Sequence, residues 1–178
     1  MIDKFSFQPI LKAEKLSLRP LTNSDFDEFF ACASDKQIWA GHPHPNRYKL
    51  SEFRPYFQAA MDAENCLVVI DNSSGKIIGS SRYYFSKTIP DDISIGFTFL
   101  IRKYWGGETN LNLKKLMLDY AFKYYPTVWF HVGSTNIRSQ KATLKIGATF
   151  SHEETLDISG KDESWLCYKI DKQQWLSK

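Results

Sequence analysis

Apolar and polar positions change their spacing along the chain in a way that predicts alternating strands and helices. A period of two residues indicates a half-buried strand, and spacings of three and four residues indicate an amphipathic helix. Capping residues, glycines and prolines separate the segments. In chain order the pattern predicts a strand over 16–21, a helix over 23–33, a loop over 40–49, a helix over 51–63 capped by Ser51, strands over 66–71, 76–85 and 93–100, a helix after the glycine pair at 106–107, a strand over 128–132, a helix over 137–146, and strands over 148–156 and 164–170.

The helix after the glycine pair has the clearest periodicity in the sequence. Its apolar residues recur at spacings of three and four and therefore share one face. That face consists of Leu113, Leu116, Met117, Tyr120, Ala121 and Tyr124, and the opposite side consists of Lys114, Lys115, Asp119 and Lys123. Pro126 is expected to end this helix, because proline lacks the backbone N–H that the helix needs.

Strict alternation in the strand over 93–100 predicts two distinct faces. Ile93, Ile95, Phe97 and Phe99 are expected on one face, and Ser94, Gly96, Thr98 and Leu100 on the other. An antiparallel start followed by a strand-helix-strand unit is typical of an α+β fold with a mixed sheet. No repeat or linker-like segment interrupts the 178 residues, so residues 1–178 are predicted to form a single domain.

Composition and charge narrow the class of protein. A hydrophobic content of 43% and an aromatic content of 15% suffice for a sizeable core. The 23 Lys and Arg and the 20 Asp and Glu are interspersed, with a net charge of +3, which argues against nucleic acid or a membrane as the main partner. Neither a signal-peptide pattern nor a membrane-length apolar run is evident, so a cytoplasmic location is expected.

Cysteine and histidine spacing does not indicate a metal or redox centre. Cys32, Cys66 and Cys167 are widely separated and are expected to be reduced and structural, although a catalytic cysteine stays an open alternative. His42 and His44 flank a proline, but no third ligand lies close in sequence. Because a metal site needs three or four convergent ligands, no metal is predicted.

The residues around Trp105-Gly106-Gly107 form the strongest candidate for a binding site. A strand precedes this segment and a helix follows it, so backbone N–H groups and the positive end of the helix dipole would form an anion site suited to a pyrophosphate. A plain tight turn is the alternative interpretation. No Lys-Ser/Thr pair follows the glycines and no G-x-G-x-x-G pattern is present, which argues against a Walker A loop and a dinucleotide fold.

Five short segments, taken in order, resemble the GNAT superfamily of N-acetyltransferases. They are Leu18-Arg19-Pro20-Leu21, Ile95-Gly96-Phe97, Tyr104-Trp105-Gly106-Gly107, Asn136-Ile137-Arg138-Ser139 and Lys145-Ile146-Gly147-Ala148. Within the superfamily the chain is similar to the branch that includes the ribosomal-protein N-terminal acetyltransferases. The resemblance extends from about residue 16 to residue 170.

The resemblance implies a GNAT-like mixed sheet flanked by helices and splayed open between the fourth and fifth predicted strands, 93–100 and 128–132. Acetyl-CoA would lie in the opening as the acyl donor. Its pantetheine arm would pair with the backbone near Phe99, Leu100 and Ile101, and its pyrophosphate would sit on Trp105, Gly106, Gly107, Glu108, Thr109 and Asn110. Asn136 matches an asparagine that contacts the pantetheine arm. Ser139 matches a serine proposed as the acid that protonates the departing thiolate. Both are the candidate catalytic residues.

The chain departs from the family pattern at several positions. Glu108 and Asn110 stand where the family's loop has small residues, and Thr143 stands where many members place a tyrosine acid. Ser94 replaces a frequent glutamate, and a serine cannot accept a proton from an ammonium at neutral pH. The base must be another group, and the candidates are Asp91, Asp92, His131 or a chain of water molecules. For His131, a satisfied structural role is the favoured interpretation over that of a base.

The function predicted from these features is transfer of an acetyl group from acetyl-CoA to a primary amine by direct attack in a ternary complex. The amine would be a protein N-terminus, an amino acid or a small amine. An acyl-CoA-binding module without catalysis and an unrelated α+β binding domain are the alternatives. Arg138, Lys141 and Lys145 either meet CoA phosphates or form a solvated face. The acceptor side is expected at the loop over 41–49 and at Trp39, Tyr48, Phe53 and Tyr56. A monomer or a homodimer fits equally well.

Overall fold

A computed structural model describes residues 4–86, 89–158 and 160–177, with the side chains of residues 89–92 outside the description. This part of the chain folds around an eight-stranded sheet with the order β1-β2-β3-β4-β5-β6-β8-β7. The strands are β1 (Leu11–Lys12), β2 (Leu16–Pro20), β3 (Cys66–Asp71), β4 (Lys76–Ser86), β5 (Ile89–Leu100), β6 (Thr127–Gly133), β7 (Thr149–Asp157) and β8 (Asp162–Asp171). The α-helices are α1 (Phe26–Ala33), α2 (Leu50–Asp62), α3 (Thr109–Ala121), α4 (Ile137–Lys145) and α5 (Lys172–Leu176), with 3₁₀ turns at Asn23–Asp25, Lys36–Trp39 and Arg102–Tyr104.

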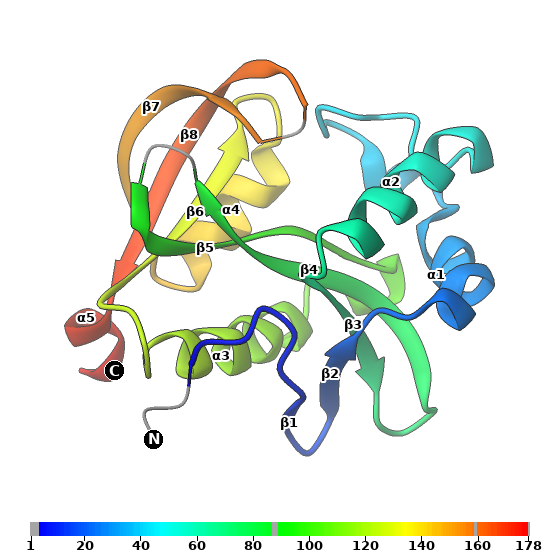
Figure 1. Ribbon diagram of the computed structural model, residues 1–178, viewed down its shortest axis with the longest axis horizontal. Coiled ribbons are helices and arrows are strands. Elements are labelled where there is room, and N and C mark those ends of the chain that lie inside the picture. Colours follow the sequence, from blue (N-terminus) through cyan, green and yellow to red (C-terminus); the bar gives the residue numbers. More distant parts are fainter. Residues whose placement is uncertain (1–3, 87–88, 159, 178) are drawn as a thin grey trace.

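Helices cover both faces of the sheet, which confirms the predicted α+β class. α1 and α2 lie on one face, and α3 and α4 lie on the other (Figure 1). β3 shows how one strand serves both sides, because Leu67 and Val69 join the core under α3 while Cys66 and Val68 join the core under α1 and α2. Among the described strands, β5 and β6 form the parallel pair, and the crossover through α3 joins them.

The predicted faces of β5 are wrong beyond Gly96, because a bulge interrupts the alternation. Ser80 pairs with Phe99 and Arg82 pairs with Gly96, so Phe97 and Thr98 together oppose Ser81 alone. Phe97 has a φ of 52°, an unusual conformation for a residue other than glycine. As a result Ile93 and Ile95 lie in the core under α3, whereas Phe99 lies in the core under α1 and α2.

The buried face of α3 also differs from the prediction. Leu113, Met117 and Ala121 are buried as expected, but Lys114 is only 6% exposed and Leu116 is only half-buried. The helix ends at Ala121, five residues before Pro126, and Phe122 closes it by donating its backbone N–H to Leu118. The proline therefore follows the turn that leads into β6 and does not itself end the helix.

Two further differences concern helix starts and short elements. Lys49, rather than Ser51, is the N-cap of α2, and its carbonyl oxygen accepts the backbone N–H groups of Glu52 and Phe53. β1 and α5 were not predicted, because segments of two and five residues are too short to show a period.

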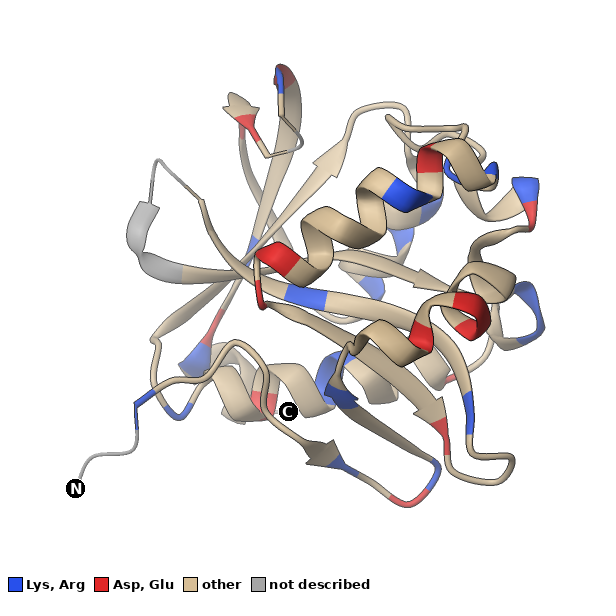
Figure 2. Ribbon diagram, turned by 45° about the vertical axis from the view of Figure 1, so that its right-hand side comes forward, with Lys and Arg blue, Asp and Glu red and all other residues tan. Residues whose placement is uncertain are grey.

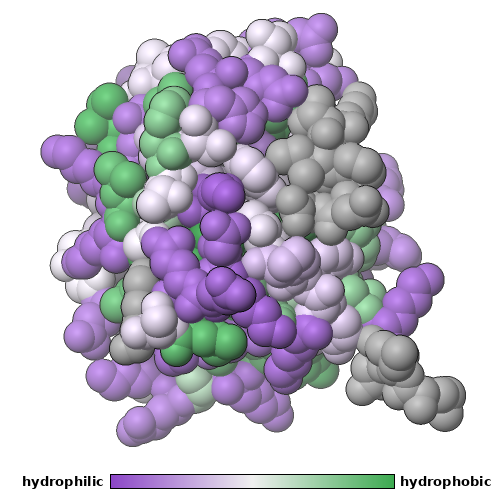
Figure 3. Space-filling model, turned by 90° about the vertical axis from the view of Figure 1, so that its left-hand side faces the viewer, coloured by the Kyte–Doolittle hydropathy of each residue, from purple (hydrophilic) through white to green (hydrophobic). Residues whose placement is uncertain are grey.

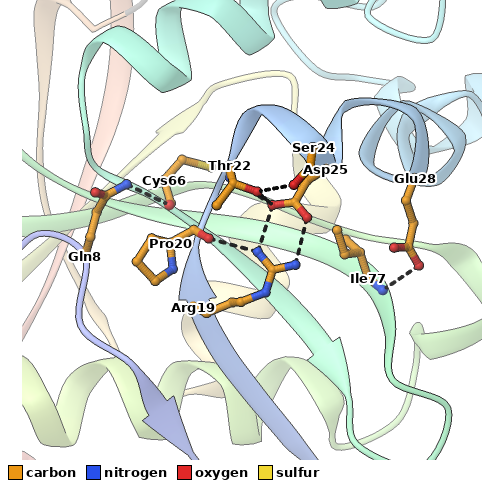
Figure 4. A network of polar contacts seen from close by, with 9 residues as sticks. All are labelled: Gln8, Arg19, Pro20, Thr22, Ser24, Asp25, Glu28, Cys66 and Ile77. Carbon is orange, nitrogen blue, oxygen red and sulfur yellow. Dashed lines mark hydrogen bonds and ion pairs between the residues drawn. The ribbon is translucent and has the colours of Figure 1, made fainter.

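A partly buried ion pair fixes the start of α1 against β2. Arg19 Nη1 and Nη2 each lie 2.7 Å from a carboxylate oxygen of Asp25, and the N–H and hydroxyl of Thr22 donate to the same carboxylate (Figure 4). Burial raises the pKa of Asp25, but the bonds from Arg19 and Thr22 outweigh that effect and leave the pKa below its ordinary value. This pair therefore stabilises the fold above that ordinary pKa and loses its effect in more acidic solution.

Charges of both signs are spread over the described surface (Figure 2). The face that turns β7 and β8 outward is mainly hydrophilic, with small and separate hydrophobic patches (Figure 3). Within the residues that the structure describes, none of the helices combines the length and apolar character that a bilayer-spanning helix needs.

Candidate active site

β5 and β6 separate soon after they meet, and this separation forms the main cleft. Their registered pairs are Ile93 with Val128 and Ser94 with Trp129, and no pair is registered beyond these two in the described strands. The cleft between the diverging parts is lined by residues 95–100 of β5, residues 130–133 of β6, the glycine turn and the inner side of α4. The opening expected between the fourth and fifth predicted strands is therefore confirmed, and it divides the sheet into β1–β5 and β6–β8 (Figure 1).

The glycine turn and the N-terminus of α3 form one end of this cleft. Gly106 has a φ of 76° and an exposed position, where an added Cβ would meet no atom within 4 Å. Glu108 is the N-cap of α3, but its side chain makes no capping bond. The first backbone N–H groups of the helix consequently have no intrahelical acceptor, as an anion site requires. Trp105, Gly106, Gly107 and Asn110 line the cleft, whereas Glu108 and Thr109 lie beside it.

The backbone at the end of β5 offers one free direction toward the cleft. Ile101 donates its N–H to Ile78 in β4 (2.9 Å), and its carbonyl accepts from Tyr104 (3.0 Å). Because backbone groups alternate sides along a strand, the Leu100 N–H and carbonyl face away from β4, toward the opening. The indole of Trp105 donates to that Leu100 carbonyl at 2.8 Å. The backbone N–H and carbonyl of Ile101, which were expected to pair with the pantetheine arm, are thus both bonded within the protein. Leu100 is the residue whose backbone faces the cleft.

Arg138 contacts both sides of the cleft near its opening. Its guanidinium lies 4.1 Å from the centroid of the Trp105 ring and donates to the carbonyls of Gln37 (3.2 Å) and Ile38 (2.6 Å). This side chain therefore holds α4, the glycine turn and the 3₁₀ turn before the acceptor loop together. Lys141 and Lys145, the other two basic residues of α4, are exposed.

Asn136 and Ser139 come together at the first turn of α4. Asn136 is the N-cap, and its Oδ1 accepts the backbone N–H of Ser139 at 3.2 Å. Both residues line the cleft, as does Thr143 one turn later, which is 6% exposed. The two candidate residues of the sequence are thus brought to one wall, with the Asn136 side chain partly used as a helix cap.

Lys114 is a cleft residue that the sequence analysis assigned to the wrong side of its helix. Its Nζ donates to Thr98 Oγ1 at 2.5 Å and to Ser81 Oγ at 3.3 Å, which places the ammonium at the β5 bulge. Burial lowers its pKa to about 7, and no carboxylate among the described residues forms an ion pair with it. The spacing held a signal for this, since Lys114 lies three and four residues before the buried Met117 and Leu118.

His131 lies on the opposite wall of the cleft and makes one well-formed hydrogen bond. Its Nδ1 is 2.8 Å from Tyr84 Oη, and its Nε2 is buried without a partner among the described residues. Tyr84 in turn pairs across the strands with Ser94, whose hydroxyl is also buried without a partner. Burial lowers the pKa of His131 to about 4, so the imidazole is neutral at neutral pH. The side chains of Asp91 and Asp92 lie outside the described part of the chain.

The residues expected on the acceptor side divide into two groups. Trp39 lines the main cleft, and Tyr56 lines a second hollow next to it. Phe53 and Tyr48 line neither hollow, and Phe53 is fully buried in the core between α1 and α2. The aromatic character of these residues could not show which of them line a cleft and which lie in the core, because aromatic residues of both kinds occur in α2 and in the segment before it.

The histidines of the loop after the second 3₁₀ turn and the cysteines have local structural surroundings. His42 Nδ1 accepts the backbone N–H of His44 at 2.9 Å, which fixes the proline-containing loop. The three cysteines are free and buried. Cys167 lies near His152 and Glu154, a trio with metal-binding side chains, but burial raises the pKa of the Cys167 thiol to about 11.

Comparison with known proteins identifies the family. The acetyltransferase (GNAT) domain family matches residues 15–149, and the chain belongs to this family, as the sequence resemblance indicated. Its class is therefore that of the acyl-CoA-dependent N-acetyltransferases. No curated protein matches the chain.

Solved structures share the fold at low sequence identity. A GCN5-related N-acetyltransferase from Brucella melitensis is 20% identical with a TM-score of 0.78, covering 95% of this chain and 81% of that chain. The spermidine N-acetyltransferase from Vibrio cholerae, solved with CoA and spermine, is 16% identical with a TM-score of 0.65, covering 91% and 98%. Mycobacterium smegmatis RimJ, solved with CoA-disulfide, is 17% identical with a TM-score of 0.67, covering 93% and 87%.

Proposed function

We propose that the protein transfers an acetyl group from acetyl-CoA to a primary amine by direct attack in a ternary complex. The observation that carries this proposal is the cleft between β5 and β6, which ends at the uncapped N-terminus of α3. We extend the proposal to one domain over residues 1–178 and to a cytoplasmic location. The continuous sheet supports the first, and the three free cysteines support the second, because a reducing compartment keeps thiols unpaired.

The donor is assigned to the side of the cleft that carries α3 and α4. Gly106, Gly107 and the first backbone N–H groups of α3 would hold the pyrophosphate, since they supply donors without a bulky side chain. The Leu100 N–H would pair with the pantetheine arm in place of Ile101. The Oδ1 of Asn136 caps α4, so this side chain would contact the donor through Nδ2. Nδ2 has no hydrogen-bond partner among the described residues. Two CoA-containing structures with the same fold support this assignment.

His131 is the base of this proposal. An amine attacks a thioester only in its neutral form, so a group on the acceptor side must take up its proton. In the tautomer that we propose, His131 Nδ1–H donates to Tyr84 Oη, and Nε2 keeps the lone pair that accepts the proton. Ser139, on the opposite wall, would donate its hydroxyl proton to the departing thiolate.

Thermal unfolding with acetyl-CoA and with free adenine nucleotides tests the donor assignment. A ligand that binds only the folded state raises its apparent stability, so acetyl-CoA should raise the Tm and the nucleotides alone should raise it much less. Release of free thiol in the presence of an amine then tests turnover. Stabilisation without turnover of any amine would favour the CoA-binding module, which Ser94 and Thr143 motivate. No stabilisation at millimolar acetyl-CoA would contradict the donor site.

A further inference from the structure

A second hollow adjoins the cleft on the face of the sheet that α2 covers. It lies between α2, β4 and the end of β7, and it shares five lining residues with the cleft. These shared residues are His44, Arg47, Tyr84, Phe97 and Ile158. Tyr84 lines this hollow and also forms a hydrogen bond with His131. A molecule bound in the hollow would therefore lie close to the proposed base.

Two arginine side chains dominate the hollow. The guanidinium carbons of Arg47 and Arg82 lie 4.3 and 4.7 Å from the centroid of the same Tyr56 ring, and Arg82 is also 4.7 Å from the Phe97 ring. Arg82 is 5% exposed, and it donates one long bond of 3.5 Å to the Tyr56 carbonyl. Its Nε has no partner among the described residues, although the Cys66 thiol lies nearby.

No acidic side chain among the described residues neutralises either arginine. The ion pairs in the described chain involve neither Arg47 nor Arg82. Glu52 and Asp157 also line the hollow, but both are exposed, and Asp157 accepts the backbone N–H of Gly160. The inner part of the hollow is therefore positively charged, and burial together with Arg82 lowers the pKa of Arg47.

Two neighbouring guanidinium groups, one buried and one half-buried, with no counter-ion among the described residues are an unfavourable arrangement. Their planar N–H donors match the two oxygens of a carboxylate or a phosphate, and such an anion would relieve both the repulsion and the unmet hydrogen bonds. A polycation would instead be repelled from this hollow. The spermidine N-acetyltransferase of the same fold thus has an acceptor of opposite charge to the one that this hollow favours.

We propose that Arg47 and Arg82 form an anion-binding subsite, so that the acceptor amine of this enzyme carries a carboxylate or a phosphate group. The inference rests on the proposed acetyl transfer and specifies its acceptor class. It places the anionic group of the acceptor between α2 and β4 and directs the amine toward Tyr84 and His131.

Calorimetric titration of the CoA-loaded protein tests the subsite without requiring turnover. The probes are glycylglycine and its amide, O-phosphoethanolamine and ethanolamine, and spermidine. An anionic member should bind about tenfold or more tightly than its neutral partner, because charge-assisted hydrogen bonds discriminate by that order. The carboxylate and phosphate pairs show which anion is preferred. Equal binding within both pairs, or tighter binding of spermidine, would overturn the subsite even if acetyl transfer is observed.

Arg47→Gln provides the mutational test, with Arg54→Gln as its matched control. Arg54 lies on α2 over the Phe26 ring and lines neither hollow. Arg47→Gln should remove the preference for the anionic probes while leaving stabilisation by acetyl-CoA unchanged, and Arg54→Gln should preserve both. Arg82→Lys keeps the charge and should retain part of the preference. If the preference persists in Arg47→Gln, the subsite is wrong; if acetyl-CoA fails to stabilise any of these proteins, the proposed function is wrong.

Discussion

The two sides of the cleft are built in different ways. The side assigned to the donor centres on the end of β5, the glycine turn and the start of α3, which are consecutive in the chain and present mostly backbone groups, and α4 adds the Asn136 side chain from beyond β6. The side assigned to the acceptor brings together α2, β4, β6 and the loop after the second 3₁₀ turn, and it presents side chains. A ligand common to a whole family can be held by backbone geometry, whereas the chemistry of one acceptor requires particular side chains.

The largest expected effect is on the acceptor side. His131→Gln should lower kcat by about 100-fold or more, because it removes the proposed base. The pKa of His131 is about 4, so protonation of this group should lower the wild-type rate in acid and should not limit the rate near neutrality. Measurement of kcat against pH checks both points, and the variant should lose the acid limb. Unchanged kcat in a folded variant would return His131 to a structural role.

On the donor side, Gly106→Val should weaken acetyl-CoA binding by about tenfold, because one residue with a branched side chain crowds a phosphate site built from backbone N–H groups. Gly75→Val is a matched control. Gly75 also has a positive φ and no atom within 4 Å of an added Cβ, but it lies in the β3–β4 hairpin and does not line the cleft. Calorimetry should show a loss for the first variant alone. Equal affinities would remove the turn from the donor site.

Ser139→Ala should slow acetyl transfer by up to about tenfold while acetyl-CoA affinity stays nearly constant, since serine is a weak acid and water can replace it in part. Ser134→Ala, an exposed position before α4, serves as the control. Single-turnover rates with saturating donor distinguish a chemical effect from a binding effect. Full activity in Ser139→Ala would exclude this hydroxyl from the mechanism.

Lys114→Met should give the smallest change, and it concerns stability. The pKa of Lys114 falls from 10.5 to about 7 in the folded protein, so the unfolded chain binds more protons between these values and wild-type stability rises with pH there. The variant should lack that rise and be about 1 kcal/mol more stable near pH 6, where the buried charge is present. Urea unfolding at pH 6 and pH 9 measures the difference. Parallel pH curves for the two proteins would contradict a buried, shifted lysine.

The sequence predicted most of the fold, and the failures have local physical causes. The predicted faces of β5 failed at Phe97, where one extra residue in the strand reverses every side chain that follows. The polar assignment of Lys114 failed because a long side chain can bury its methylene groups and still reach two hydroxyl groups inside the protein. The alternation of residues in a strand does not reveal the bulge opposite Ser81. The spacing of residues in a helix likewise does not reveal the hydrogen-bond partners of Lys114.

The candidate site shows the same division. Gly106, Asn136 and Ser139 could be proposed from the sequence, because a turn before a helix and a helix cap are local patterns with a known geometry. Arg82 was not proposed from the sequence, although an arginine in the interior of β4 that is followed by three aromatic residues was a signal. Arg47 was missed because nothing near it in the chain indicates that it meets Tyr56 and Arg82.

The family and most of the order of the elements could be predicted from the sequence, and a donor side rich in backbone groups could be proposed from it, because these depend on residues that are close together in the chain. Which side chains meet at the cleft depends on contacts between distant parts of the chain. The tertiary structure paired His131 with Tyr84 across 47 residues and placed Arg82 against the Tyr56 ring contributed by α2. Burial then lowered the pKa of His131, and burial is a property of the packed chain rather than of any segment of it.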